Sequence, residues 1–216
     1  MTGPDAPPDE PGRDCPLCPR LAAFRAEWRA REPAWHNAPV PSFGPLDARL
    51  LIVGLAPGLR GANRTGRPFT GDWAGDLLYD TLVRYGFAGG SYDRRRDDGL
   101  FPVDCRITNA VRCVPPENRP TTAENRACLP FLAAEIAAMP RLDTILALGG
   151  LAHGMALAAL GLKKSAFAFR HGAFHPVANR LTLADSYHCS RYNTNTRRLT
   201  PEMFRAVFAG IRARLA

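Results

Sequence analysis

The sequence predicts a single α/β domain with three layers, α/β/α, around a four-stranded parallel sheet. Four short segments expected to be strands alternate with segments expected to be helices, the order that produces parallel strands joined by helices. The chain has 216 residues, of which 46% are hydrophobic, enough for one large core. Residues 1–14 are rich in Pro, Gly and Asp, so we expect a disordered tail there and the domain over 15–216.

Each element has a local signal. The run LLIV at 50–53 is continuously apolar, as in a strand covered on both faces. We expect strands at 50–53, 104–111, 144–150 and 180–186, and helices at 16–31, 72–85, 122–139, 151–160 and from 201 onward. Thr121 with Glu124 forms a capping box, and Thr200 before Pro201 is a good helix start. The remaining long segments, 87–102, 162–179 and 186–196, are expected to be a charged loop, an irregular stretch and a polar loop.

The charge balance indicates a polyanionic partner. Lys and Arg number 28 against 20 Asp and Glu, a formal charge of +8, and only Lys163 and Lys164 are lysines. A GC-rich genome accounts for arginine in place of lysine but not for the excess of positive charge. The chain has no apolar run of membrane-spanning length, and the first residues lack the basic and apolar regions of a signal peptide. We therefore expect a cytoplasmic protein that does not enter a membrane.

The cysteines favour a metal centre over disulfides, because no export signal accompanies them. Cys15 and Cys18 are two residues apart in a C-x2-C pair, while 14 residues separate Cys113 from Cys128. Four soft ligands suit a zinc ion or an iron–sulfur cluster, and the second gap is wide for a zinc knuckle, which favours the cluster. Cys105 and Cys189 are expected to be ordinary small apolar residues.

The polar loops that follow the four predicted strands should surround one site, because ligands of such sheets bind beyond the carboxyl ends of the strands. The first of these loops, GLAPG, could be a phosphate-binding turn, but it lacks the Gly-Lys-Ser/Thr of a P-loop. This segment alone is a weak signal for nucleotide binding.

Three segments together with the cysteines carry a family resemblance. GLAPGLRGANRTGRPFTGD, TNAVRCVPPENRPT and SYHCSRYNTNT, in this order, resemble a family 5 (type b) uracil-DNA glycosylase over nearly the whole chain. The resemblance implies removal of uracil from double-stranded DNA, which leaves an abasic site. It also implies a [4Fe–4S] cluster on Cys15, Cys18, Cys113 and Cys128, with zinc as the alternative. Leu55 stands where the related family 4 enzymes have a water-positioning Glu.

The resemblance implies catalytic roles for Asp72, Asn109 and His188. Asp72 is the only carboxylate in its loop and could orient water or stabilise a cationic sugar, although its position also suits a helix cap. Asn109 offers a donor and an acceptor to the uracil edge, or else satisfies local backbone. His188 would donate to uracil O2 as negative charge develops. His153 is expected to be structural or to line the site, and His175 to be a loop residue.

The same resemblance implies base-binding and DNA-binding residues. Phe69 resembles the aromatic residue that stacks on the flipped base, and with it the base pocket comprises Gly54, Leu55, Ala56, Phe69, Asn109 and His188. For DNA contacts, Arg64 and Arg67 are expected to meet phosphates, and Arg191, Tyr192 and Asn193 to enter the minor groove. A solvated loop is the simpler interpretation of the last three.

The sequence therefore predicts a monomeric, cluster-containing DNA glycosylase of bacterial base-excision repair, located in the cytoplasm at the nucleoid. The apolar Leu55 suggests a broader base range, including hypoxanthine. The main alternative is a non-catalytic, metal-containing DNA-binding module with a decayed pocket. A metal-dependent enzyme acting on a free nucleotide, and a relative that bonds covalently to DNA through a histidine, are more distant alternatives.

Overall fold

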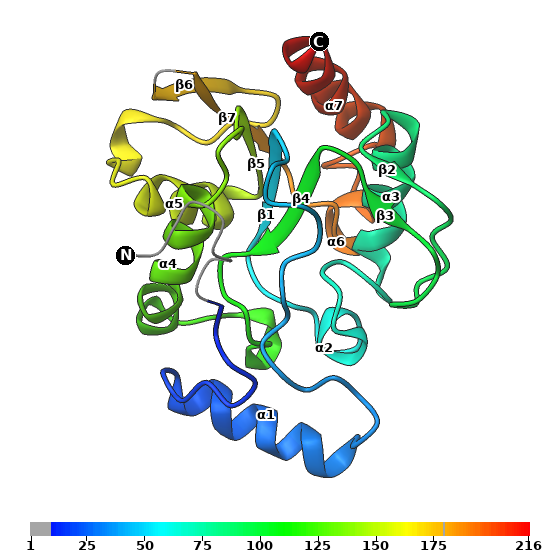
Figure 1. Cartoon of the computed structure of the whole chain (residues 1–216), viewed down its shortest axis with the longest axis vertical. Coiled ribbons are helices and arrows are strands. Elements are labelled where there is room, and N and C mark those ends of the chain that lie inside the picture. Colours follow the sequence, from blue (N-terminus) through cyan, green and yellow to red (C-terminus); the bar gives the residue numbers. More distant parts are fainter. Residues whose placement is uncertain (1–9, 179) are drawn as a thin grey trace.

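The computed structural model describes residues 10–178 and 180–216 and confirms the three-layer α/β/α architecture (Figure 1). The central sheet has the strand order β4-β1-β5-β7-β6. Its strands are β1 (Leu50–Gly54), β4 (Cys105–Asn109), β5 (Thr144–Leu148), β6 (Phe174–Ala178) and β7 (Leu181–Ser186). The four predicted strands are all present and run parallel to one another. Their carboxyl ends therefore lie along one edge of the sheet.

The sheet has five strands where four were predicted. The additional strand, β6, pairs with β7 in the antiparallel direction, so the expectation of an irregular segment over 162–179 is wrong for 174–178. Pro176 lies inside β6 and lacks the N–H that an interior strand needs. It is tolerated because β6 is the edge strand, and the register shifts between Pro176 and Ala178. Two further short strands, β2 (Ala88–Gly89) and β3 (Phe101–Pro102), pair within the predicted charged loop.

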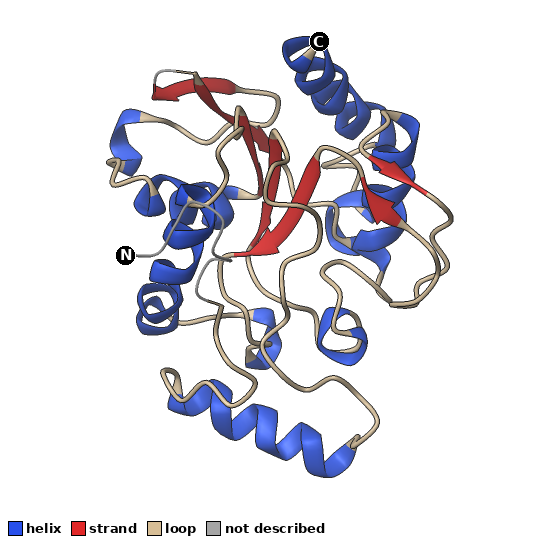
Figure 2. Cartoon of the chain, viewed as in Figure 1, coloured by secondary structure: helices blue, strands red, loops and turns tan. Residues whose placement is uncertain are grey.

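Seven α-helices complete the described chain (Figure 2). They are α1 (Pro19–Arg31), α2 (Ala62–Thr65), α3 (Trp73–Arg84), α4 (Thr122–Ala137), α5 (Gly150–Ala159), α6 (Arg191–Asn195) and α7 (Pro201–Leu215). The predicted capping box is present, since Thr121 Oγ1 accepts from Glu124 N at 3.2 Å and Glu124 Oε2 accepts from Thr121 N at 2.7 Å. The short helix α6 lies within the predicted polar loop 186–196, which is therefore partly helical.

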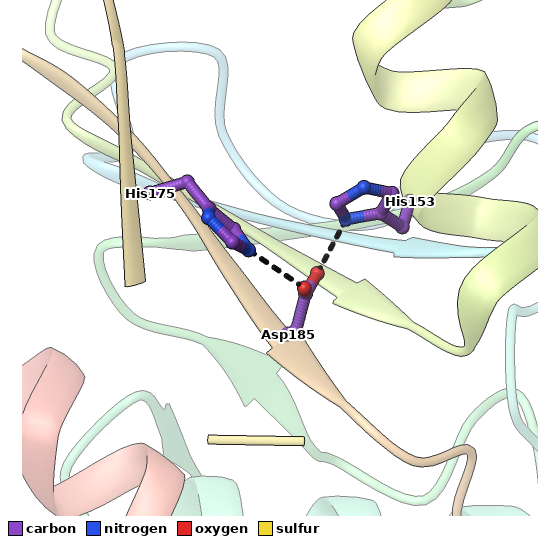
Figure 3. A group of neighbouring side chains, drawn as sticks. All are labelled: His153, His175 and Asp185. Carbon is purple, nitrogen blue, oxygen red and sulfur yellow. Dashed lines mark hydrogen bonds and ion pairs between the residues drawn. The ribbon is translucent and has the colours of Figure 1, made fainter. Parts of the chain in front are cut away.

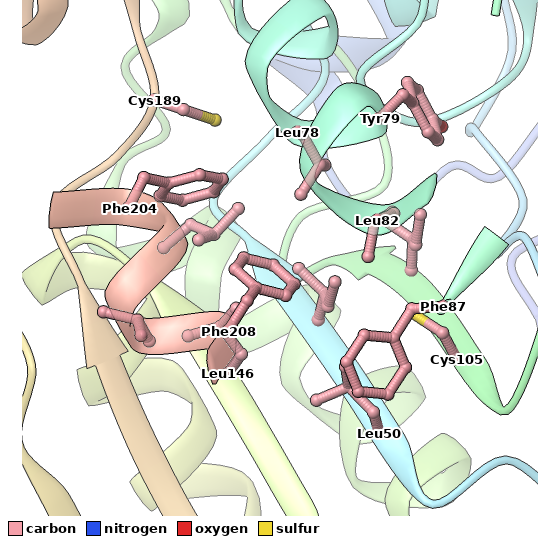
Figure 4. Close-up of a cluster of buried hydrophobic side chains, with 14 of the residues drawn as sticks. Leu50, Leu78, Tyr79, Leu82, Phe87, Cys105, Leu146, Cys189, Phe204 and Phe208 are labelled. Carbon is pink, nitrogen blue, oxygen red and sulfur yellow. The ribbon is translucent and has the colours of Figure 1, made fainter. Parts of the chain in front are cut away.

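The core is divided by the sheet, because alternate residues of each strand face opposite layers. On one face, Leu50 and Ile52 of β1 pack under α3 and α7, where Leu78, Tyr79, Leu82, Phe204 and Phe208 gather (Figure 4). On the other face, Leu51 and Val53 pack with residues of α4 and α5. Both helix layers thus hold β1 rigidly beneath the loop that follows it.

Helix α1 lies apart from the sheet, at the bottom of Figure 1, and packs through Leu21 on Val111, Cys113 and Cys128. Of the predicted tail, residues 1–9 lie outside the described residues, while residues 10–14 contact α1 through the ion pair of Asp14 with Arg29. Among the described helices, none combines the length and the apolar character needed to cross a bilayer.

Candidate active site

A cavity of about 400 Å³ opens at the carboxyl edge of the sheet. Leu55 follows β1, Asn109 ends β4, and His188 follows β7, so three strands deliver side chains to its walls. Phe69 and Asp72 reach it from the segment between α2 and α3. The predicted convergence of the strand-end loops is therefore present for β1, β4 and β7.

Gly54, the last residue of β1, is not among the described residues that line this cavity, but it makes room for two that are. It pairs with Asn109 across β1 and β4, and a Cβ atom built on it would lie 2.6 Å from Cζ of Phe69 and would also collide with Oδ1 of Asn109. Real Cβ atoms do not approach so closely, so only glycine permits Phe69 and Asn109 to meet here. Asn109 itself is only 3% exposed, at the end of β4.

Asp72 occupies the N-cap position of α3 but makes no side-chain capping hydrogen bond. Its Oδ1 atom is buried and has no hydrogen-bond partner among the described residues. Burial raises the pKa of Asp72, and the facing backbone N–H groups of Gly75 and Ala74 oppose this rise without forming the capping bond. An acceptor that is buried and unpaired is costly unless a ligand or water uses it. The carboxylate is thus available to a group inside the cavity.

Phe69 and His188 form an aromatic wall. Their ring centroids are 5.9 Å apart with 30° between the planes, and Phe69 has a positive φ of 52° in a tight loop. The Tyr92 hydroxyl donates to the Phe69 carbonyl at 3.3 Å, which anchors that loop. Phe69 is 7% exposed and belongs to the core cluster as well as to the cavity. Burial lowers the pKa of His188 to about 4, so its imidazole is neutral at neutral pH.

The four predicted ligand cysteines gather behind this cavity, where Cys18, Cys113 and Cys128 pack with Ala56 of the cavity wall. They form no disulfides. No three of their Sγ atoms lie within 4.8 Å of one another, whereas thiolates on one zinc ion would be about 3.8 Å apart, given ~2.3 Å Zn–S bonds. The buried guanidinium of Arg25 donates to Cys113 Sγ at 3.4 Å, which suits a thiolate group of net negative charge.

Comparisons with known proteins agree with this geometry. A family model described as the uracil DNA glycosylase superfamily matches residues 41–212. The type-5 uracil-DNA glycosylase of Thermus thermophilus is 47% identical over 196 residues, covering 88% of this chain and 89% of that protein. The type-5 enzyme of Mycobacterium tuberculosis is 42% identical over 205 residues, covering 90% and 75%. The chain belongs to the uracil DNA glycosylase superfamily.

Within this superfamily the predicted resemblance to family 5 is confirmed by the type-5 relatives. The type-4 uracil-DNA glycosylase of Thermotoga maritima, by comparison, is 41% identical over only 110 residues, half of this chain. The likeness to type 5 therefore extends over the segments that build the cavity.

Arg67 lies in the interior of the protein, whereas the predicted phosphate contact requires an exposed side chain. Its side chain is only 3% exposed and pairs with Asp98 through two hydrogen bonds of 2.7 and 2.8 Å. It also donates to Thr70 Oγ1 at 2.7 Å. This placement contradicts the predicted phosphate contact, because the guanidinium is buried and already paired with Asp98. Arg64, three residues earlier, is exposed, and its Nε donates to the carbonyl oxygen of Arg60 at 2.9 Å.

The other predicted DNA contacts lie on α6, beside the cavity. Arg191 and Tyr192 are exposed, Tyr192 at 71%. Asn193 is partly buried, and its Nδ2 atom donates to the carbonyl oxygen of His188 at 2.8 Å. Asn193 thus fixes the backbone of His188, a position that the sequence pattern does not reveal.

Several residues of the cavity wall were missed by the sequence reasoning, among them Trp73 and Asn118. Trp73 begins α3, directly after Asp72, and Asn118 follows the proline pair of the 111–121 loop. Asn118 has a positive φ of 55°, a conformation that Asn adopts more readily than most residues. Asn118 could have been found from its place in the motif TNAVRCVPPENRPT, whereas no pattern in the sequence marks Trp73.

A second polar cluster lies outside the cavity (Figure 3). Asp185 on β7 faces His153 Nδ1 at 2.7 Å and His175 Nε2 at 3.0 Å, and His153 Nε2 lies 2.9 Å from the carbonyl oxygen of Phe167. These are hydrogen-bond distances, shorter than the ~3.3 Å between zinc ligands in a tetrahedral site. We interpret the group as a hydrogen-bonded anchor between the sheet and the segment leading into β6. His175 therefore lies in a strand and not in the predicted loop.

Proposed function

We propose that this chain is a type-5 uracil-DNA glycosylase, which hydrolyses the N-glycosidic bond of uracil in double-stranded DNA and leaves an abasic site. The observation that carries the proposal is the buried, unpaired Oδ1 of Asp72 in a cavity that Asn109, His188 and Phe69 also line. The catalytic domain in this proposal is 15–216. The type-5 names of the relatives support the same activity.

Asp72 is the proposed catalytic carboxylate. Cleavage of the glycosidic bond produces an oxocarbenium-like sugar, which a nearby carboxylate stabilises, and the same group can orient the attacking water. The raised pKa of Asp72 reflects burial, so the ionised group is poorly solvated and gains most from a cationic sugar or an ordered water. Leu55 offers no polar atom for this task.

The departing uracil would be held by Asn109, His188 and Phe69. Base cleavage requires that the nucleotide leave the duplex stack, and stacking on an aromatic ring is worth ~1–3 kcal/mol. A neutral His188 can donate one hydrogen bond to O2 of the leaving base, which becomes negative as the bond breaks. Asn109 offers a donor and an acceptor to the base edge. The apolar Leu55 favours acceptance of further deaminated bases such as hypoxanthine.

DNA would approach along the edge formed by α2, α3 and α6. The exposed side chains of Arg64, Arg191 and Tyr192 face that approach, and the formal charge of +8 favours a nucleic acid over a free base. Asn193 supports the minor-groove loop through His188. We propose a monomer that acts in the bacterial cytoplasm, at the nucleoid, in base-excision repair.

Cys15, Cys18, Cys113 and Cys128 are the proposed ligands of a [4Fe–4S] cluster. The wide spacing of the Sγ atoms supports a cluster over the alternative of one zinc ion. When bound, the cluster would supply a cross-link between α1, the loop after β4 and α4. Because Ala56 lies on both the cysteine group and the cavity, this cross-link would support the cavity wall.

The test is a single-turnover incubation with an end-labelled duplex that carries one U·G pair, followed by alkali cleavage. Wild-type protein should produce a break at the uracil, and Asp72→Asn should lose it while keeping DNA affinity. Binding without a break, on uracil and hypoxanthine duplexes alike, would favour a non-catalytic DNA-binding module. Iron and sulfide analysis of the same preparation tests the cluster independently.

A further inference from the structure

Trp73 is a large aromatic side chain at the mouth of the cavity that the proposed reaction does not use. It is 47% exposed, although it follows Asp72 directly and lines the cavity. Tryptophan is enriched at binding interfaces, since it combines a large apolar ring with one polar N–H group.

The indole is held in place before any ligand arrives. Its Nε1–H donates to Thr194 Oγ1 at 2.9 Å, and the guanidinium of Arg191 lies 5.6 Å from the ring centroid. Both partners belong to α6, which lies beside α3 in Figure 1. Because the hydrogen bond to Thr194 already fixes the indole, the ring loses little conformational entropy when a flat ligand stacks on it.

We propose that Trp73 is a stacking site for a nucleobase of the damaged strand, next to the nucleotide that enters the cavity. This inference rests on the proposed function. Three observations select a nucleotide as the occupant: the ring borders the cavity, a cation lies over it, and the chain carries an excess of positive charge. A base stacks on the indole while Arg191 moves to the adjoining phosphate. Many proteins bind single-stranded nucleic acid in this way, with aromatic rings under the bases and cations at the phosphates.

Fluorescence gives a direct test, because stacking of a base quenches tryptophan emission. The other two tryptophans, Trp28 and Trp35, stack on each other with centroids 5.5 Å apart, on and just after α1 and away from the cavity. The ligand is a duplex with a stable abasic-site analogue, and the variants are Trp73→Phe, Trp73→Ala and Thr194→Val. Thr194→Val removes the hydrogen bond to the indole but keeps the ring.

Wild-type protein and Thr194→Val should both lose emission on binding the duplex, and Trp73→Phe should not. Trp73→Ala should bind the duplex about 5- to 150-fold more weakly, the fold-change expected for one lost base stack, and Trp73→Phe should retain most of the affinity. Circular dichroism melts of each variant check that the fold is intact.

Two results would overturn the stacking site while leaving the proposed function in place. One is normal excision and wild-type affinity in Trp73→Ala. The other combines two observations: Thr194→Val loses as much affinity as Trp73→Ala, and wild-type emission is not quenched by the duplex. That result would mean that Trp73 supports α6 and does not stack on a base. Failure of wild-type protein to bind or cleave any of the duplexes would instead refute the proposed function itself.

Discussion

Replacing Arg67 by methionine tests whether this arginine stabilises the fold or binds DNA. The guanidinium is almost fully buried, donates twice to Asp98 and once to Thr70, and lies over the rings of Phe43, Tyr79 and Tyr92 at 5.2 to 5.8 Å. Methionine keeps the apolar contacts but leaves the Asp98 carboxylate, whose side chain is 0% exposed, without its cation. Removing one partner of a buried ion pair costs about 3–5 kcal/mol.

For a chain of this size, each kcal/mol corresponds to roughly 2–4 °C in Tm, so Arg67→Met should lower Tm by about 6–20 °C. Urea unfolding followed by circular dichroism measures the free energy directly. Burial alone would raise the pKa of Asp98, but the hydrogen bonds from Arg67 and from two backbone N–H groups outweigh it and hold the pKa well below the usual range. The ion-pair contribution is therefore present above pH ~3.8 and lost as the pH falls further, so variant and wild type should converge in acid.

The double variant Arg67→Met with Asp98→Asn should recover part of the loss, because it removes the unpaired carboxylate. Arg64→Gln is the matched control on the exposed side. It should leave stability within about 0.5 kcal/mol and reduce the salt slope of DNA binding by about 0.9. The structural assignment is refuted if Arg67→Met melts like wild type and shows that reduced slope instead.

Three further changes test the site and its surroundings. Asp72→Asn should lower the single-turnover rate by about 10²–10⁴-fold. Because burial raises the pKa of Asp72, the variant should also have a higher Tm than wild type at pH 7, and this difference should shrink as the pH falls toward 3.8. For the same reason, the wild-type rate should begin to fall at a pH above 3.8 as the solution is acidified. Asp185→Asn should lower the unfolding free energy by about 3–5 kcal/mol in urea, whereas Asp143→Asn, at a partly exposed pair with Arg214, should cost less than ~1 kcal/mol; equal losses would contradict the anchor role. Gly61→Ala places a Cβ atom 2.7 Å from Asp72 Cγ and should slow excision about 10²-fold with nearly normal DNA affinity, and an unchanged rate would show that Asp72 tolerates displacement.

The parallel part of the fold could be predicted because its signals are local. The strands β1 and β5 are short, largely apolar runs, and the caps at Thr121 and Thr200 are decided by residues within one helical turn. Strand β6 gave no such signal. Its burial alternates between exposed and half-buried and it contains Pro176, so its pairing with β7 follows from the tertiary structure alone.

The site shows the same division between local and distant causes. Asp72, Asn109 and His188 were predicted because each lies in one of the three motifs, near an end of a predicted helix or strand, and all three line the cavity. Arg67 was misread because its partner Asp98 lies 31 residues later, in a charged stretch that resembles a solvated loop. The pattern of one segment cannot indicate that a distant carboxylate will be buried against it.

The glycines at the end of β1 and in the segment after it make room for side chains of the site, although the pattern GLAPG suggests phosphate binding. As a phosphate-binding turn, GLAPG is a poor match, yet three glycines of the extended segment lack a Cβ atom where a site residue needs the room. Gly54 admits Phe69, while Gly58 and Gly61 both border Asp72, whose Oδ2 would lie 2.8 Å from a Cβ atom on Gly58. The same packing that admits the carboxylate also shields it from water and leaves one oxygen unpaired. The glycines of this segment therefore make room for the acidic side chain that they surround. In the proposed reaction, the unfavourable burial of that carboxylate is relieved when a cationic sugar or a water interacts with it in the cavity.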